Sequence, residues 1–154
     1  MKKILLILVL LGLGYIGYSQ GKPPLAKGEN QLNFGVTGVG NGIPVYASLE
    51  FCVFDDITVG PAASFDFING NSALKVGAIG NYHWNKLIGI PSKFDFYAGL
   101  NAGFRFDFSK SKNSRFDLGA QVGGRWFWSE QWGLNAEFGF SGSVAGGFGV
   151  TYKL

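Results

Sequence analysis

His83 is the only histidine of the chain and therefore the first candidate for acid–base chemistry. Hydrolysis or acyl transfer would require it to lie beside a hydroxyl nucleophile and an acidic partner. The serines expected near loops, Ser72 and Ser141, fall a full strand length away from it in the arrangement that the sequence pattern predicts. We therefore expect no enzymatic activity, and we expect His83 to make hydrogen bonds at the membrane interface or inside the fold.

Cysteine and metal chemistry are equally weakly supported. Cys52 is the only cysteine, so the chain cannot form an internal disulfide. No basic neighbour in the sequence argues for a reactive thiol, and we expect Cys52 to be a small buried filler. Because the sequence contains no cluster of ligand-type residues, we predict neither a metal site nor a cofactor.

Charged residues are the more promising group, because they recur on one side of an alternating pattern. An isolated charge inside a narrow lumen is costly, so we expect these residues to pair and to fill the lumen. A packing role is favoured over a regulated pore. The predicted network comprises Glu50, Lys75, Arg105, Arg125 and Glu137, with His83, Asp95, Asp66, Asp107 and Asp117 on the same face.

These side chains would be positioned by β-strands, whose successive residues point to opposite faces. In Phe94–Phe108 one face is entirely apolar, whereas the other carries Asp95, Arg105 and Asp107. Arg115–Trp128 repeats the pattern. Weaker alternation predicts further strands around residues 32–36, 45–53, 57–67, 74–84, 132–140 and 144–154.

Together these segments predict an all-β fold, an eight-stranded antiparallel transmembrane β-barrel with up-and-down meander order. Three features fit it less well. Pro61 lies inside the third strand and should require a bulge, because proline removes a ladder donor. Ile79 is apolar on the inner face, and the connection 85–93 is the longest although it falls on the periplasmic side.

The N-terminal segment divides the chain into three parts. Residues 1–19 have two lysines, an apolar run and small residues before Gln20, which is typical of a cleaved signal peptide. Residues 20–30 are expected to be a periplasmic lead-in without structure of its own, and residues 31–154 to be the barrel. Without Lys2 and Lys3 the chain is nearly neutral, so nothing suggests binding to nucleic acid.

The composition indicates which face of the barrel meets lipid. Charged residues make up only 15% of the chain, against roughly 25% in a soluble domain, and the polar face is mainly Gly, Ser, Asn and Thr. A soluble barrel with an apolar core is the alternative, but it would leave this uncharged face unexplained. Amphipathic rings favour the membrane interface. The predicted girdle at the periplasmic ends comprises Trp84, Trp126, Trp128, Trp132 and Tyr152.

The strand FDFYAGLNAGFRFDF, the terminal GFGVTYKL and the signal ending in SQ resemble the small outer-membrane barrels typified by OmpX and the OmpA transmembrane domain. The resemblance covers about residues 30–154 and implies a buried lumen network. Some barrels of this size modify lipids, but they need a triad that His83 is poorly placed to form. Such barrels usually end in an aromatic residue recognised by the assembly machinery, whereas this chain ends in Leu154.

The functional expectation is a structural or interaction barrel in the outer membrane of a Gram-negative bacterium, with both termini periplasmic. Its expected partners are outer-membrane lipid and, during insertion, the assembly machinery. A porin-like channel for small solutes is one alternative, although an eight-stranded barrel is normally too narrow for an open channel. An accessory subunit of a larger outer-membrane complex is the other, because lipid and a partner barrel both favour apolar surface.

Overall fold

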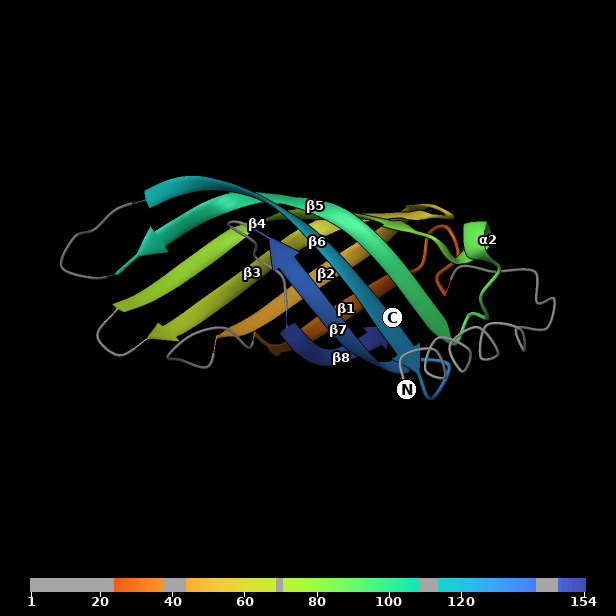
Figure 1. Ribbon diagram of the computed structural model, residues 1–154. Helices are drawn as coiled ribbons and strands as arrows, with labels where there is room; N and C mark the ends of the chain where they lie inside the picture. Colours follow the sequence, from red (N-terminus) through yellow and green to blue (C-terminus); the bar gives the residue numbers. More distant parts are fainter. Residues whose placement is uncertain (1–23, 38–43, 69–70, 109–113, 141–146) are drawn as a thin grey trace, which may run out of the picture.

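The computed structural model describes residues 24–37, 44–68, 71–108, 114–140 and 147–154 (Figure 1). The predicted signal peptide, residues 1–19, lies outside them. Among the described residues no helix is long and apolar enough to cross a membrane. The elements are β1 (Asn30–Val36), β2 (Val45–Phe54), β3 (Ile57–Ile68), β4 (Asn71–His83), α2 (Asn85–Ile88), β5 (Phe94–Asp107), β6 (Ser114–Phe127), β7 (Trp132–Phe140) and β8 (Gly147–Lys153).

The strands form a closed barrel in which each pairs antiparallel with the next in sequence. Closure comes from β1 and β8, where Leu32 lies opposite Tyr152. The predicted eight-stranded meander is therefore confirmed, including the order of its strands. A closed ring has no free sheet edge, so backbone polar groups can be satisfied without water.

The two faces of the barrel have inverted polarity. Among the described residues, the buried set contains 17 polar or charged side chains and only nine apolar ones. Large apolar side chains point outward instead, such as Leu100 with 71% of its surface exposed and Phe138 with 71%. A water-soluble protein buries its apolar residues, so this distribution fits a barrel whose outer face meets hydrocarbon.

Pro61 does not cause the bulge that the sequence predicts. Its pairing with Ala78 of β4 is regular, and the register between β2 and β3 is the same on both sides of it, from Ala47–Ala63 to Phe51–Val59. The register shift in this hairpin lies instead between Cys52 and Phe54, beside the turn. The strand remains regular because proline lacks only one backbone N–H donor, and the hydrogen-bonded pairs on either side keep the strands in register. Ile79 does point inward, where it is buried with Ala62.

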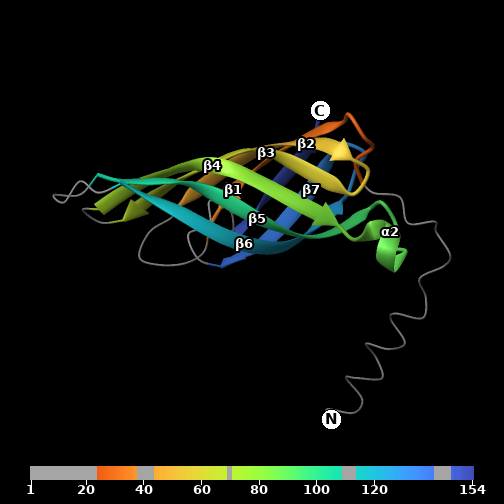
Figure 2. The same cartoon turned by 90° about the horizontal axis from the view of Figure 1, so that it is seen from above.

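The end of the barrel that carries residue 24 and the C-terminus is more ordered than predicted. Figures 1 and 2 place α2 toward the same end as the C-terminus. The expectation of an unstructured lead-in is wrong for its described part. Gly28 and Glu29 extend the hydrogen bonding of β1 to Cys52, and a turn at Ala26 brings Leu25 to a buried position with 2% exposure. An apolar side chain in a polar segment can thus anchor that segment.

The connection 85–93 is also ordered. It is anchored by Asn85, whose side chain is completely buried. Its side-chain amide donates to the Phe94 carbonyl at 2.6 Å and accepts from the Phe96 N–H at 3.4 Å. These contacts tie the short helix α2 to the start of β5. They explain how a connection that interrupts the strand pattern remains compact.

Candidate functional site: a charge cluster in the lumen

Arg125 of β6 is the centre of the candidate site. Its Nη2 lies 2.5 Å from Glu50 Oε1 and its Nη1 lies 2.7 Å from Asp95 Oδ2. All three side chains are at most 1% exposed. Asp95 is the residue directly opposite Arg125 on β5, whereas Glu50 reaches it from β2 on another part of the wall. One guanidinium therefore links strands that are not neighbours.

His83 joins the same cluster from β4. Its Nδ1 lies 2.7 Å from Asp95 Oδ1, and its Nε2 lies 3.0 Å from the hydroxyl of Thr58. Thr58 in turn donates to Glu50 Oε2 at 2.5 Å. His83 therefore bridges Asp95 on one side of the cluster and Thr58 on the other.

The order Asp95, His83, Thr58 is that of a carboxylate, imidazole and hydroxyl relay. Two observations argue against a nucleophilic role for Thr58. Its side chain is 1% exposed, and its proton is committed to Glu50 and not to His83. The arrangement holds charges in place. Ser72 makes none of these contacts, and Ser141 lies outside the described residues.

Glu137 lies one step from the cluster. It accepts a hydrogen bond from the hydroxyl of Tyr97 at 2.7 Å, and the Tyr97 ring lies 4.0 Å from the guanidinium carbon of Arg125. The sequence pattern predicts Glu137 and Arg125 as members of one network. The structure brings the two together through an aromatic ring that contacts both.

Neutral side chains continue the network around the lumen, and sequence reasoning missed them. Asn33 of β1 donates to Glu50 at 2.7 Å and accepts from Thr151 of β8 at 2.7 Å. On the other side, Asn81 donates to Glu50 at 3.2 Å and accepts from Gln121 at 2.8 Å. With Asn135 of β7, which donates to Thr151, every strand contributes a hydrogen-bonding side chain. The signal available in the sequence was that these neutral polar residues all occupy inward-facing positions of their strands.

Arg105 and Lys75 lie apart from this cluster, nearer the end of the barrel opposite α2 and the C-terminus. Both approach Asp66, at 3.3 and 3.6 Å, and Arg105 also contacts Asp107 at 2.7 Å. Asp117 pairs with Arg115 at 3.0 Å. The five residues predicted as one network therefore divide into two groups. Glu50, Arg125 and Glu137 belong to the cluster around Arg125, whereas Lys75 and Arg105 gather around Asp66.

The predicted girdle residues lie on the outer face at the end that carries α2 and the C-terminus. Trp84, Trp126, Trp128 and Trp132 are each 40–48% exposed. Two pairs of rings are in contact, with centroids 6.5 Å apart for Trp126 and Trp128 and 4.6 Å apart for Trp132 and Tyr152. Cys52 is buried, and its thiol contacts the Phe54 carbonyl at 3.1 Å. No group of three potential metal ligands occurs in the described part of the chain.

Solved structures provide the comparison, since no family model and no curated protein matches the chain. The crystal structure of the outer-membrane protein OprG from Pseudomonas aeruginosa is similar with a TM-score of 0.64 and 12% identity, covering 86% of this chain and 99% of that one. The N-terminal β-barrel domain of OprF from the same organism gives 0.60 and 15%, covering 84% and 100%. A structure from a study of de novo designed transmembrane β-barrels gives 0.56 and 16%, covering 84% and 98%.

The chain has the fold of these small transmembrane barrels. At such low identities the likeness concerns the backbone alone. It agrees with the inverted polarity of the two faces, which was observed independently.

Proposed function

We propose that the protein is an outer-membrane barrel with a structural or interaction role, whose lumen is closed by the charge cluster. The observation that carries the proposal is the complete burial of Arg125, Glu50 and Asp95 within hydrogen-bonding distance of one another. A conducting pore needs water beside its charges, whereas these side chains have at most 1% exposure. The interior of an eight-stranded barrel is just wide enough for its own side chains.

The proposal includes export through a cleaved signal peptide of residues 1–19 and location in the outer membrane of a Gram-negative bacterium. Both termini would face the periplasm, where the girdle of Trp84, Trp126, Trp128, Trp132 and Tyr152 would mark the interface. The outward aromatic and aliphatic side chains support a lipid-embedded wall. No catalytic role is proposed, because the Thr58 hydroxyl is neither exposed nor free to react.

Single-channel recording in planar bilayers tests the closed lumen. The wild-type protein is expected to give no large stable conductance steps, since the cluster blocks the path of ions. Replacing Arg125 and Glu50 together by alanine should shorten the plug and increase the frequency or size of openings. Large stable steps from the wild-type protein would contradict the proposal and favour the channel alternative.

A further inference from the structure

The short helix α2 exposes apolar side chains beyond the ends of the strands. Leu87 is the most exposed large apolar side chain among the described residues, at 74%, and its neighbour Ile88 is 48% exposed. On the barrel wall an exposure of this size belongs to outward side chains such as Leu100, at 71%. Leu87 belongs to no strand, so its exposure needs an explanation of its own.

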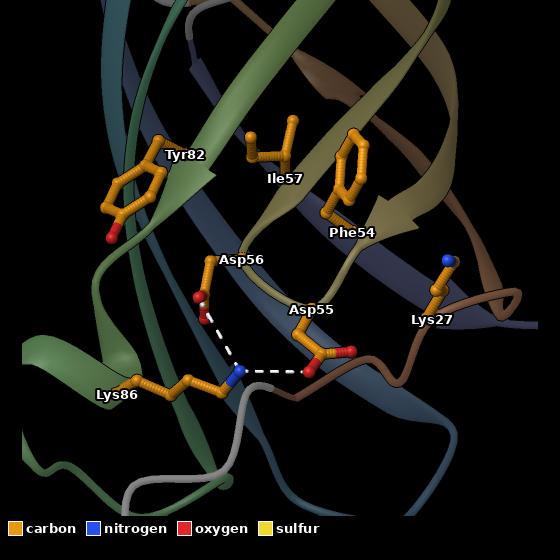
Figure 3. A pocket seen from close by; sticks show the side chains of 7 residues that line it. All are labelled: Lys27, Phe54, Asp55, Asp56, Ile57, Tyr82 and Lys86. Atoms are coloured by element: carbon orange, nitrogen blue, oxygen red, sulfur yellow. Dashed lines mark hydrogen bonds and ion pairs between the residues drawn. The ribbon is translucent and has the colours of Figure 1, made fainter.

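Two polar side chains hold α2 in place. Asn85 ties it to the start of β5 through the two hydrogen bonds described above. Lys86 reaches from α2 to the turn between β2 and β3, where it contacts Asp55 at 3.0 Å and Asp56 at 3.6 Å (Figure 3). The hydrogen bond with Asp55 raises the pKa of Lys86, so the ion pair persists at neutral pH. The helix is therefore held from two sides.

The apolar side chains of α2 lie on the same side as Trp84. The Ile88 N–H donates to the Trp84 carbonyl at 3.0 Å, and residues three and four positions apart are neighbours on a helical surface. Trp84 is 42% exposed, and its own N–H donates to the carbonyl of Phe96, another outward ring. Leu87 and Ile88 therefore continue the outward aromatic surface past the end of the wall.

The chain returns to the barrel directly after these two residues. Gly89 adopts a left-handed conformation, with a φ of 67°, and ends α2. Ile90 is then buried, at 7% exposure. The same connection thus buries one aliphatic side chain and presents two others on a fixed helical turn. This arrangement also accounts for its length, which exceeds that of an ordinary hairpin turn.

We propose that α2 is an interfacial anchor, which inserts Leu87 and Ile88 among the lipids of the leaflet at this end of the barrel. An α-helix rises 1.5 Å per residue, so Ile88 lies at most about 6 Å from Trp84 along the helix axis. The interfacial region of one leaflet is roughly 5–8 Å thick. A turn of helix that begins at the girdle therefore stays within this region whatever its tilt.

Continuity with the girdle favours lipid over a protein as the occupant of this surface. The surface begins at Trp84, whose amphipathic ring suits the membrane interface, and a protein partner would have to displace lipid from it. The inference rests on the proposed function for the location of the barrel in a membrane. It goes beyond it by assigning a membrane contact to a segment outside the strands.

Depth-dependent fluorescence quenching of the full mature protein in phosphatidylcholine vesicles tests the anchor. Cys52→Ser removes the only native thiol, and Leu87→Cys, Leu100→Cys or Ser92→Cys then accepts one bimane label. Because an interfacial helix lies about 5–10 Å deep, lipids brominated near the headgroup should quench the label at position 87 about twofold more than lipids brominated at the chain end. The label at position 100, in the middle of β5, should show the opposite order.

Ser92 provides the matched control, since it is exposed in the same connection and has a polar side chain. Its label should be quenched by aqueous iodide and little by brominated lipid. Ile88→Cys is a second test of the helical face and should behave like Leu87→Cys. Heat-modifiable migration on gels shows whether each labelled variant is folded.

Each other outcome contradicts a particular claim. Equal quenching at positions 87 and 92 would mean that the label itself sets the depth, which overturns the anchor. Quenching at position 87 by iodide alone would place α2 in water, and shielding from both quenchers would place it against a protein or a second copy. Either result overturns the anchor while leaving the barrel in the membrane. A label at position 100 that brominated lipid does not quench would contradict the proposed membrane location, and the anchor with it.

Discussion

At the scale of single residues, the interior of the barrel depends on the guanidinium of Arg125. Removing it would leave two carboxylates buried without a cationic partner. Arg125 faces two carboxylates at 2.5 and 2.7 Å, and none of the three can turn toward water. Desolvating an ion pair can cost more free energy than the pair returns. The cluster is therefore better understood as a device that specifies how the interior packs than as a large source of stability.

Arg125→Met should lower the free energy of unfolding by about 3–5 kcal/mol, because Glu50 and Asp95 would keep buried charges without a partner. Urea unfolding in lipid vesicles, followed by tryptophan fluorescence, measures the change. Arg115→Met is the control, since Arg115 is 62% exposed beside Asp117 and its loss should cost less than about 1 kcal/mol. Equal losses in the two variants would show that burial does not govern the contribution of Arg125.

How far the site was predictable differs from residue to residue. Alternation placed Glu50, Arg125 and Glu137 on the inner face, as it did Asp95 and His83. It could not give the partner of each, since that depends on the stagger between strands and on distances across the lumen. Counting outward from the loop 109–113 would have paired Asp95 with Phe127, two residues from its partner Arg125, because the ladder of this hairpin begins with Phe106 opposite Ser114. The contact of Glu50 with Arg125 crosses the interior and has no local signal.

At the scale of strands, small residues create the space that the cluster needs. Gly123 of β6 lies opposite Tyr97 of β5, and a Cβ at this position would approach the Tyr97 ring and hydroxyl to 2.5 Å. Because Gly123 has no side chain, the Tyr97 ring can lie over it and contact both Arg125 and Glu137. This is a packing requirement and not one of backbone conformation.

Gly123→Ala should therefore destabilise the barrel by about 1–3 kcal/mol, because the Tyr97 ring must leave its position. The adjacent glycine is a close control, since a Cβ at Gly124 would lie 3.4 Å from the Phe96 ring, an ordinary contact. Midpoints of heat-modifiable migration compare the two variants. A larger effect from Gly124→Ala would refute this account of the inner glycines.

Strands were easier to predict than the segments between them. The period-two pattern identified β5 and β6 almost to the residue, because both faces of a barrel wall are chemically distinct. It could not show that Leu25 or Asn85 anchors its segment, since each is one buried residue in a polar stretch. Pro61 misled for a related reason: the tolerance of a ladder for one missing donor depends on the pairs around it.

At the scale of the whole molecule, the two ends of the ring are neighbours. The Leu154 N–H donates to the Asn30 carbonyl at 2.9 Å, directly after the pairing of β1 with β8. Joining these residues through a short linker and opening the chain between Ser129 and Glu130 should leave every strand pair intact. The permuted chain is expected to fold, with heat-modifiable migration and circular dichroism like those of the original. A permuted chain that stays unfolded would mean that β8 must end the chain for insertion.

The pairing of Gln31 with Lys153 also determines when the barrel can close during folding. The first strand can pair with its second neighbour only after the last strand has been synthesised. Every shorter chain therefore leaves the backbone groups of an edge strand unpaired. Contacts between residues so far apart in sequence form slowly. A chain whose outward side chains are apolar is therefore most prone to aggregation before all its strands are present, and less so once the barrel is complete.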